Sequence, residues 1–171
     1  SKNLLQILND ILDFSKIEAN AMQISPRATL LAPFIENIHS LFSPIIHSNN
    51  VEFIIQRSPD LPDCLNVDDL RLNQIIINLL SNAQKFTQAG FVRLSFDYKD
   101  EQLTVSVSDS GIGIEKEQQL LLFSEFTQAD ASVARKDGGT GLGLAICQGL
   151  IKKIDGEITL NSVPGLGSTI K

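Results

Sequence analysis

Apolar and polar residues alternate along this chain in two rhythms, one typical of helices and one typical of strands. Near the N-terminus an apolar stripe recurs at spacings of three and four residues, and a second stripe runs beside it; the stripes are Leu5, Leu8, Leu12, Ser15, Ala19 and Leu4, Ile7, Ile11, Phe14. A helix that is apolar over so wide a face does not stand alone. It is either a core helix or half of a helical hairpin in a dimeric bundle, and its N-terminal position favours the hairpin.

The rest of the chain predicts strands and helices in mixed order. We expect helices near 34–47, at 115–122 and at 142–154, and a further helix that begins at a cap, Asp68 or Asp69, and ends at about Phe86. Pro26 and Pro33 lie on the path to the first of these helices. We expect strands at 51–56, 91–98, 103–108, 157–163 and 168–170, the second and third forming a hairpin. Residues 124–139 have no clear period, and we expect them to be mobile. The pattern predicts an α+β fold, a two-layer sandwich whose mixed, mostly antiparallel sheet is covered by helices on one face.

Composition and charge narrow the class of protein. The chain has 171 residues, of which 43% are apolar and 20% charged, values typical of one globular domain. Its net charge of −6 and its lack of a Lys/Arg cluster argue against nucleic acid as a partner. No apolar run reaches the roughly 18 residues that a membrane span needs, and the start has no signal-peptide pattern. We therefore expect a soluble, cytosolic domain.

The two cysteines, Cys64 and Cys147, lie far apart in the sequence. Neither belongs to a CxxC pair or has a histidine at metal-ligand spacing, which argues against a disulfide or a zinc site. We expect two reduced, buried thiols.

Three polar segments carry the candidate chemistry, and the first is a helical stripe. Asn78, Asn82 and Lys85 stand at i, i+4 and i+7, so they share the face opposite the apolar one. Asparagine inside a helix costs roughly 0.5 kcal/mol against alanine, so two of them one turn apart ask for a reason. A solvated surface is one explanation. The other is chemical, because amide oxygens suit Mg²⁺ and an ammonium group suits phosphate.

The second and third segments are glycine-rich. Asp109, Gly111 and Gly113 follow directly on a strand, where a carboxylate can accept a hydrogen bond from an exocyclic amine and glycines let the backbone approach a flat ligand. The run GGTGLG at 138–143 precedes a helix, which places free N–H groups and the positive end of the helix dipole at a glycine-lined mouth. The Walker, dinucleotide and protein-kinase glycine motifs do not match. Each segment alone also fits an ordinary turn, but together they predict a nucleotide pocket.

These segments resemble the motifs of sensor histidine kinases, within the superfamily of gyrase, chaperone, histidine-kinase and mismatch-repair ATPases. The similar runs are NQIIINLLSNAQKFT at 73–87 (N box), DSGIGI at 109–114 (G1), LFSEFTQAD at 122–130 (F), GGTGLGLAI at 138–146 (G2) and GLGST at 165–169. The opening LLQILNDILDFSKIEA resembles the second helix of a dimerisation and phosphoacceptor domain. The resemblance implies that residues 1–20 are that helix and that residues 21–171 are an ATP-binding catalytic domain of the Bergerat type. The F box and the SKIEA helix are similar to those of hybrid kinases.

The resemblance also implies a role for each matching residue. Asn78 and Asn82 would hold Mg²⁺, Lys85 would contact phosphate, and Asn78 and Lys85 would serve catalysis. Asp109 would read adenine with the backbone of Gly111, Gly113 and Ile114 beside it, while Phe86 and Thr169 would line the base and ribose. The triphosphate would be wrapped by Gly139, Thr140, Gly141, Leu142 and Gly143, and a lid at 123–138 would bring Arg135 and Lys136 to it. Asp137 departs from the family, which often has an aromatic residue there.

Asn78 further favours phosphoryl transfer over hydrolysis. Hydrolytic members of the superfamily have a glutamate at this position, and an amide cannot take a proton from water near neutral pH. The family's acceptor histidine stands in an HExxR-type box on the hairpin's first helix; we expect it to lie outside this chain, because His39 and His47 have no such neighbours. The implied partners are that acceptor helix, a response regulator receiver domain and a second copy of a membrane-anchored parent, with this part in the cytoplasm. The alternatives are a regulatory nucleotide-binding module without turnover, which Asp137 keeps open, and a hydrolytic ATPase.

Overall fold

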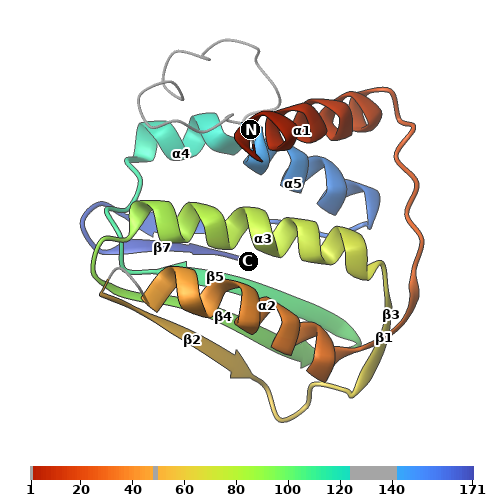
Figure 1. The fold of residues 1–171 in the computed structure, drawn as a ribbon, viewed down its shortest axis with the longest axis horizontal. Helices are drawn as coiled ribbons and strands as arrows, with labels where there is room; N and C mark the ends of the chain where they lie inside the picture. The colour runs from red at the N-terminus through yellow and green to blue at the C-terminus, as the bar shows by residue number, and fades with distance from the viewer. Residues whose placement is uncertain (1, 48–49, 124–141) are drawn as a thin grey trace.

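A five-stranded sheet with helices on one face forms the body of the molecule (Figure 1). The computed structural model describes residues 2–47, 50–123 and 142–171. The strand order is β2-β4-β5-β7-β6; β2 runs parallel to β4 and the other neighbours are antiparallel. The predicted α+β class and the mixed, mostly antiparallel sheet are therefore confirmed.

The described elements follow one another with short connections. The helices are α1 (Lys2–Glu18), α2 (Leu31–His47), α3 (Asp69–Phe86), α4 (Lys116–Phe123) and α5 (Gly143–Lys153). The strands are β1 (Arg27–Leu30), β2 (Val51–Arg57), β3 (Cys64–Val67), β4 (Gly90–Lys99), β5 (Gln102–Asp109), β6 (Leu160–Val163) and β7 (Gly167–Ile170). Within this part of the chain, no helix is both long and apolar enough to cross a bilayer.

The core lies between the sheet and the helices α2, α3 and α5. Val92, Leu94 and Phe96 alternate along β4 and are fully buried, because successive side chains of a strand point to opposite faces. Ile76 and Leu80 meet them from α3, one turn apart on its apolar face. This packing leaves the other face of α3, with its asparagines, turned toward α5.

Two strands of the structure were not predicted. β1 and β3 pair antiparallel as a separate two-stranded sheet, with Arg27 opposite Val67 and Leu30 opposite Cys64. Each strand has only four residues; β1 shows no regular alternation, and β3 alternates only between exposed and half-buried positions. Strands this short carry too little periodicity to be recognised before their partner is known.

Helix α2 begins at Leu31, three residues before the predicted start. Pro33 therefore lies in the first turn, where a helix needs no N–H donor and the fixed φ of proline is tolerated. Pro26 does precede the helix. The strand predicted at 157–163 is also shorter at its start, since β6 begins at Leu160.

The prediction of two buried thiols is half wrong. Both cysteines are free and Cys147 is buried in α5, but Cys64 is exposed. Cys64 is the first residue of β3, a strand of the small sheet that packs outside the main core. The expectation of burial rested on the lack of disulfide and metal-ligand spacing, which does not determine how a residue packs, and the position of this unpredicted strand leaves Cys64 exposed.

Candidate functional site

The polar face of α3 forms one wall of the site. Asp68 caps this helix, because its carboxylate accepts a hydrogen bond from the N–H of Arg71 at 3.0 Å. With the apolar side of the helix fixed in the core, Asn78 and Asn82 are half-buried and Lys85 is exposed. The three side chains share a face, as the spacing predicted.

The second wall is the start of α5. The side-chain amide of Asn78 donates to the carbonyl of Gly143 at 3.4 Å, which joins the middle of α3 to the first residue of α5. Leu142 precedes the helix and provides no side-chain cap for its N–H groups. N–H donors that Leu142 does not cap, together with the positive end of the helix dipole, favour an anion at this point. We refer to Asn78, Asn82, Leu142 and Gly143 as the phosphate end.

The carboxylate of Asp109 marks the opposite end of the site. Asp109 is the last residue of β5, and its Oδ1 accepts a hydrogen bond from the N–H of Gly111 at 2.8 Å. Burial raises the pKa of this carboxyl above its usual range, while hydrogen bonds from the backbone of Gly111 and Ser168 offset part of the shift. A half-buried acceptor with a raised pKa is a feature typical of functional sites.

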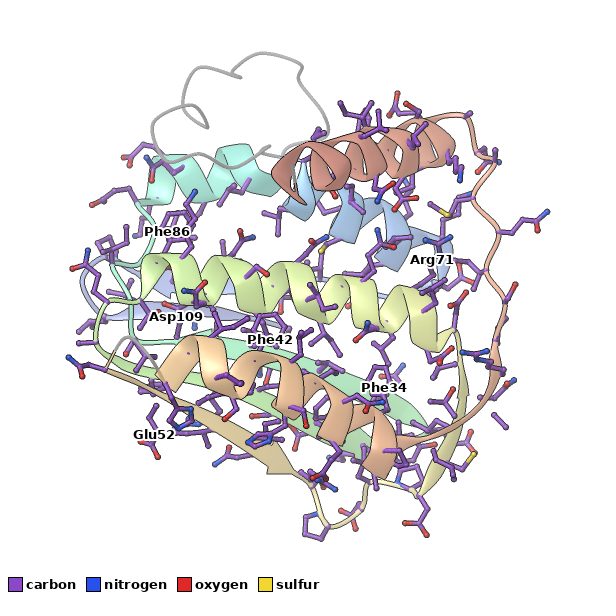
Figure 2. The ribbon with its side chains drawn as sticks, in the orientation of Figure 1. Phe34, Phe42, Glu52, Arg71, Phe86 and Asp109 are labelled. Carbon is purple, nitrogen blue, oxygen red and sulfur yellow. The ribbon has the colours of Figure 1, made fainter. Side chains whose placement is uncertain are left out.

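The turn after Asp109 rests on the C-terminal end of α3. A Cβ atom at Gly111 would lie 2.3 Å from the carbonyl oxygen of Phe86 and 2.8 Å from Oδ1 of Asp109, so only glycine fits between them. Ile112 donates to the same carbonyl at 3.3 Å. Figure 2 shows Phe86 and Asp109 at the same end of the molecule. The structure thus brings the first and second polar segments together.

The same turn also rests on the β6–β7 hairpin. Gly113 has φ +68°, and a Cβ there would lie 2.2 Å from the carbonyl oxygen of Val163. The N–H of Ile114 donates to the hydroxyl of Ser162 at 2.8 Å, and the N–H of Gly165 donates to the carbonyl of Ile112 at 2.8 Å. These contacts hold Asp109 between α3 and the hairpin.

Two residues that support this turn were not predicted from the sequence. The side-chain amide of Gln119, in α4, donates to the carbonyls of Ile114 at 2.6 Å and Ser162 at 3.0 Å. Neither Gln119 nor Ser162 stands in a motif, and single polar residues in a helix and a strand give no signal of such contacts. Only the folded arrangement shows that they fix the turn.

The end of α3 also presents an aromatic ring, a cation and a buried hydroxyl. The ring of Phe86 is 38% exposed, and the Lys85 ammonium lies 5.0 Å from its centroid. Thr87 is buried, and its Oγ1 has no hydrogen-bond partner among the described residues. A buried hydroxyl without a partner is uncommon and suits a site completed by a ligand or water.

Thr169 does not lie where we expected it. It pairs with Ser108, and their hydroxyl oxygens are 2.9 Å apart, whereas Asp109 pairs with Ser168. Side chains alternate along strands, so Thr169 faces the helix-free side of the sheet and Asp109 faces the helices. Ser168 contributes to the site in its place, because its backbone donates to Asp109. We therefore leave Thr169 out of the pocket.

The buried thiol of Cys147 lies directly behind the phosphate end. Burial raises its pKa to about 12, and a hydrogen bond with the Asn78 side chain offsets part of the shift. The thiol also donates to the carbonyl of Ile75 at 3.8 Å. Cys147 is a packed, neutral group that supports Asn78 and is not available as a nucleophile.

Several predicted residues lie outside the described part of the chain. They are Arg135, Lys136, Asp137, Gly138, Gly139, Thr140 and Gly141, together with the rest of the expected lid beyond residue 123. Of the residues expected to wrap the triphosphate, the structure describes Leu142 and Gly143.

Both histidines make structural contacts away from this site. The His39 ring stacks on Phe53 at a centroid distance of 5.9 Å with an interplanar angle of 12°. His47 Nδ1 lies 2.9 Å from the carbonyl oxygen of Ser43, one turn earlier in α2. These contacts agree with the helical, non-catalytic interpretation of their spacing.

The sequence and the structure of this chain are both similar to those of known proteins. The model of the family described as histidine kinase-, DNA gyrase B- and HSP90-like ATPase matches residues 67–171. The sensor histidine kinase RcsC of Escherichia coli (strain K12) is 42% identical over 168 residues, which cover 98% of this chain and 18% of RcsC. The chain thus spans about a fifth of the length of the curated relatives it matches.

Two solved structures resemble the whole arrangement. Full-length ShkA in complex with AMPPNP superposes with a TM-score of 0.83 at 32% identity, covering 98% of this chain and 34% of that one. The catalytic domain of histidine kinase ThkA superposes with a TM-score of 0.69 at 28% identity, covering 87% of this chain and 93% of that one. The ATP-binding fold expected from the motifs is therefore confirmed.

Proposed function

Because the chain belongs to the family of histidine kinase-, DNA gyrase B- and HSP90-like ATPases, we propose that it is the ATP-binding catalytic part of a sensor histidine kinase. In this role it transfers the γ-phosphate of Mg-ATP to a histidine of its parent protein. The observation that carries the proposal is the hydrogen bond between Asn78 of α3 and Gly143 at the start of α5, with Asp109 held against the C-terminal end of α3 through the turn at Gly111. Its relatives are named as kinases, which disfavours both a regulatory module without turnover and a hydrolytic enzyme.

Each end of the pocket fits one part of ATP. The carboxylate of Asp109 accepts a hydrogen bond from the adenine amine, close to the exposed ring of Phe86 and the unpartnered hydroxyl of Thr87. The N–H groups at the start of α5 bind phosphate oxygens. Lys85 lies beside Phe86 at the base end of the site, and we propose that its long side chain reaches the phosphates from there. Within the lid, we propose the same role for Arg135, Lys136 and the glycines and threonine at 139–141.

The donor set suits magnesium. Among the described residues, no group of three or more His, Cys, Asp or Glu side chains could hold a metal by itself. Mg²⁺ takes few protein ligands and shares the substrate's phosphates, so the amide oxygens of Asn78 and Asn82 would hold it together with ATP. The ion would neutralise charge on the phosphates during transfer.

The chemistry at Asn78 favours transfer to a nucleophile that needs no deprotonation. A neutral imidazole nitrogen attacks the γ-phosphorus, a nitrogen–phosphorus bond forms, and the bond to the bridging oxygen breaks so that ADP leaves. An amide at position 78 cannot remove a proton from water, so hydrolysis is slow by comparison. We propose that the acceptor is neither His39, stacked on Phe53, nor His47, which is engaged by the Ser43 carbonyl.

The parent protein would supply the other partners. We propose that residues 1–20 are the second helix of a dimerisation hairpin, because Leu8, Ile11 and Leu12 form an exposed apolar stripe on α1. A second copy would cover that stripe in a four-helix bundle. A receiver domain of a response regulator would take the phosphate next, as a complex of ThkA with the response regulator TrrA suggests. We propose a cytoplasmic position for this domain in a membrane-anchored parent.

Calorimetry and labelling test the proposal together. We expect Mg-ATP to bind with a Kd between about 1 μM and 1 mM, or roughly −8 to −4 kcal/mol. Adding the parent's hairpin that carries the acceptor histidine, with labelled ATP, should then yield phosphohistidine on the hairpin and none on His39 or His47.

Replacing Asn78 by alanine should abolish that labelling, and Asn161→Ala is the matched control because Asn161 is exposed on β6, outside the pocket. If ATP binds but no phosphate is transferred to the hairpin, the regulatory module is favoured. If Asn78→Ala leaves the ATPase rate unchanged, position 78 has no hydrolytic role. If ATP does not bind in the presence of Mg²⁺, the proposal is wrong.

A further inference from the structure

The N-terminal helix is held against the nucleotide-binding helices along one face. Asp13 and Ile17 of α1 and Asn20 just beyond it are spaced by four and three residues, so they lie on one side. Asp13 contacts Gln74 of α3. Ile17 contacts Gly149 of α5, and Asn20 contacts Lys153 near the end of the same helix. Figure 1 shows α1 lying along α5 above α3. Leu8 and Ile11 of the exposed apolar stripe lie on the opposite side of α1, and Leu12 borders the groove between α1 and α3.

The contact with α5 depends on a glycine. Glycine is unfavourable inside a helix, yet Gly149 stands in the middle of α5. A Cβ at this position would lie 2.5 Å from Cγ2 of Ile17, a distance that the branched side chain cannot accommodate without moving α1. The close approach of the two helices gives a physical reason for this residue.

The contact with α3 is a chain of two hydrogen bonds, which we call the Gln74 relay. The Arg71 guanidinium donates to Oε1 of Gln74 at 3.0 Å, and Nε2 of Gln74 donates to the carboxylate of Asp13 at 2.8 Å. Gln74 is half-buried and has both its donor and acceptor atoms engaged. Figure 2 shows Arg71 toward the end of α3 that is remote from Phe86 and Asp109.

The relay stands next to the phosphate end. Gln74 lies one turn before Asn78 on α3, and both residues line a groove of about 370 Å³ between α1 and α3. Asn78 in turn bonds Gly143 at the start of α5. The two helices that grip α1 are therefore the same two helices whose polar groups form the phosphate end.

We propose that Gln74 is a positioning residue, and that its relay to Asp13, with Ile17 seated on Gly149, couples the docking of α1 to Mg-nucleotide binding. This inference rests on the proposed function, because it assigns nucleotide to the pocket between α3 and α5. With α1 docked, α3 and α5 are fixed relative to each other and the phosphate end is preorganised. Release of α1 loosens that pair of helices and weakens nucleotide binding. The coupling must be reciprocal, so bound nucleotide must also strengthen the docking of α1.

A charge-swap experiment on the 171-residue chain tests the coupling. In Gln74→Glu two carboxylates face each other and α1 is released, whereas in Asp13→Asn/Gln74→Glu the new amide of residue 13 donates to the new carboxylate and docking returns. Gln56→Glu is the matched control, since Gln56 is exposed on β2 and the charge change is the same. Two quantities are measured: hydrogen exchange of the α1 amides at 8–18, and the Kd of Mg-AMPPNP by calorimetry.

The expected results are linked by reciprocity. Mg-AMPPNP should slow exchange in α1 of the unaltered chain by about 5-fold, and Gln74→Glu should raise the Kd by the same factor of about 5. The double variant should restore both values, and Gln56→Glu should change neither. Faster exchange in Gln74→Glu with an unchanged Kd would show that docking and binding are independent. Unchanged exchange would show that the relay does not hold α1.

A second pair of variants guards against a folding defect. Gly149→Ala should release α1 and raise the Kd, although alanine is the better helix former. Adding Ile17→Ala to it should relieve the overlap and lower the Kd again. If Gly149→Ala leaves α1 exchange and the Kd unchanged, the close contact does not position α1. Failure of the unaltered chain to bind Mg-AMPPNP would instead count against the proposed function itself.

Discussion

Replacing Gly113 by alanine tests whether the turn that carries Asp109 is held by the β6–β7 hairpin. Gly113 has φ +68°, and a non-glycine residue in this region costs about 1–2 kcal/mol. The new Cβ would also lie 2.2 Å from the carbonyl oxygen of Val163, well inside the 3.0 Å below which such contacts essentially never occur. The turn and the hairpin must therefore separate.

That separation strains two hydrogen bonds. They join Ile114 to Ser162 and Gly165 to Ile112, both at 2.8 Å, and each contributes about 1 kcal/mol. We therefore expect Gly113→Ala to lower the free energy of unfolding by about 3–4 kcal/mol, the sum of these losses and the backbone strain. The affinity for ATP should fall as well, because the backbone around Asp109 moves.

Gly165→Ala is the matched control. Gly165 has a similar φ of +77°, but a Cβ there has nothing within 4 Å, so only the strain of about 1–2 kcal/mol applies. Urea denaturation of both variants measures the difference, expected at about 2 kcal/mol, or about 4–8 °C in Tm for a chain of this size. ATP affinity should be unchanged in Gly165→Ala. Equal losses of stability in the two variants would refute the argument, because they would leave no energetic role for the contact with Val163.

Four further predictions concern the ends of the pocket and the thiols. Asp109→Asn should reduce the preference for ATP over GTP, measured by calorimetry, because an amide can present a donor as well as an acceptor to the base. As the pH falls toward the raised pKa of Asp109, its carboxylate gains a proton, so ATP affinity should decline at a higher pH than an ordinary aspartate would give. Asp109→Asn should lack this decline. If ATP affinity declines in the same way in Asp109→Asn and in the unaltered chain, Asp109 is not the source. Asn82→Ala should weaken nucleotide binding by about 10-fold with Mg²⁺ and little with EDTA, and equal weakening in both would rule out a metal ligand. An alkylating reagent at pH 8 should label only the exposed Cys64 in the folded chain and both thiols in urea, because burial raises the pKa of Cys147 to about 12. Mass spectrometry counts the labels. Rapid labelling of both thiols in the native chain would contradict the buried position of Cys147.

The elements with a long and regular pattern were predictable. The helix α3 has 18 residues, a capping aspartate and an unbroken apolar face, and its predicted and observed bounds agree. The hairpin of β4 and β5 was equally clear, and its turn residues Asp100 and Glu101 adopt the positive φ values that tight hairpin turns use. In such segments each local preference points to the same structure as the tertiary packing.

The predictions that failed depend on contacts between distant segments. The strand β1 exists because β3 pairs with it, and Arg27 is further tied to Asp69 by two hydrogen bonds of 2.6 Å. The face on which Thr169 lies depends on the register between β5 and β7, and a shift of one residue would reverse it. No sequence window of a dozen residues contains both partners of either pair.

By itself, the sequence determined the fold class, and it predicted where the nucleotide pocket that we propose would lie. These features can be recognised locally, because the glycines, the carboxylate at the end of a strand and the stripe of asparagines each meet a local requirement of backbone conformation or ligand chemistry. Only the tertiary structure decided which residues hold these groups in place. Gln119 and Ser162 support Asp109, Cys147 supports Asn78, and Gln74 connects Asp13 of α1 to α3. Side chains that act through distant partners have no pattern of their own, because their partners become neighbours only when the chain is folded.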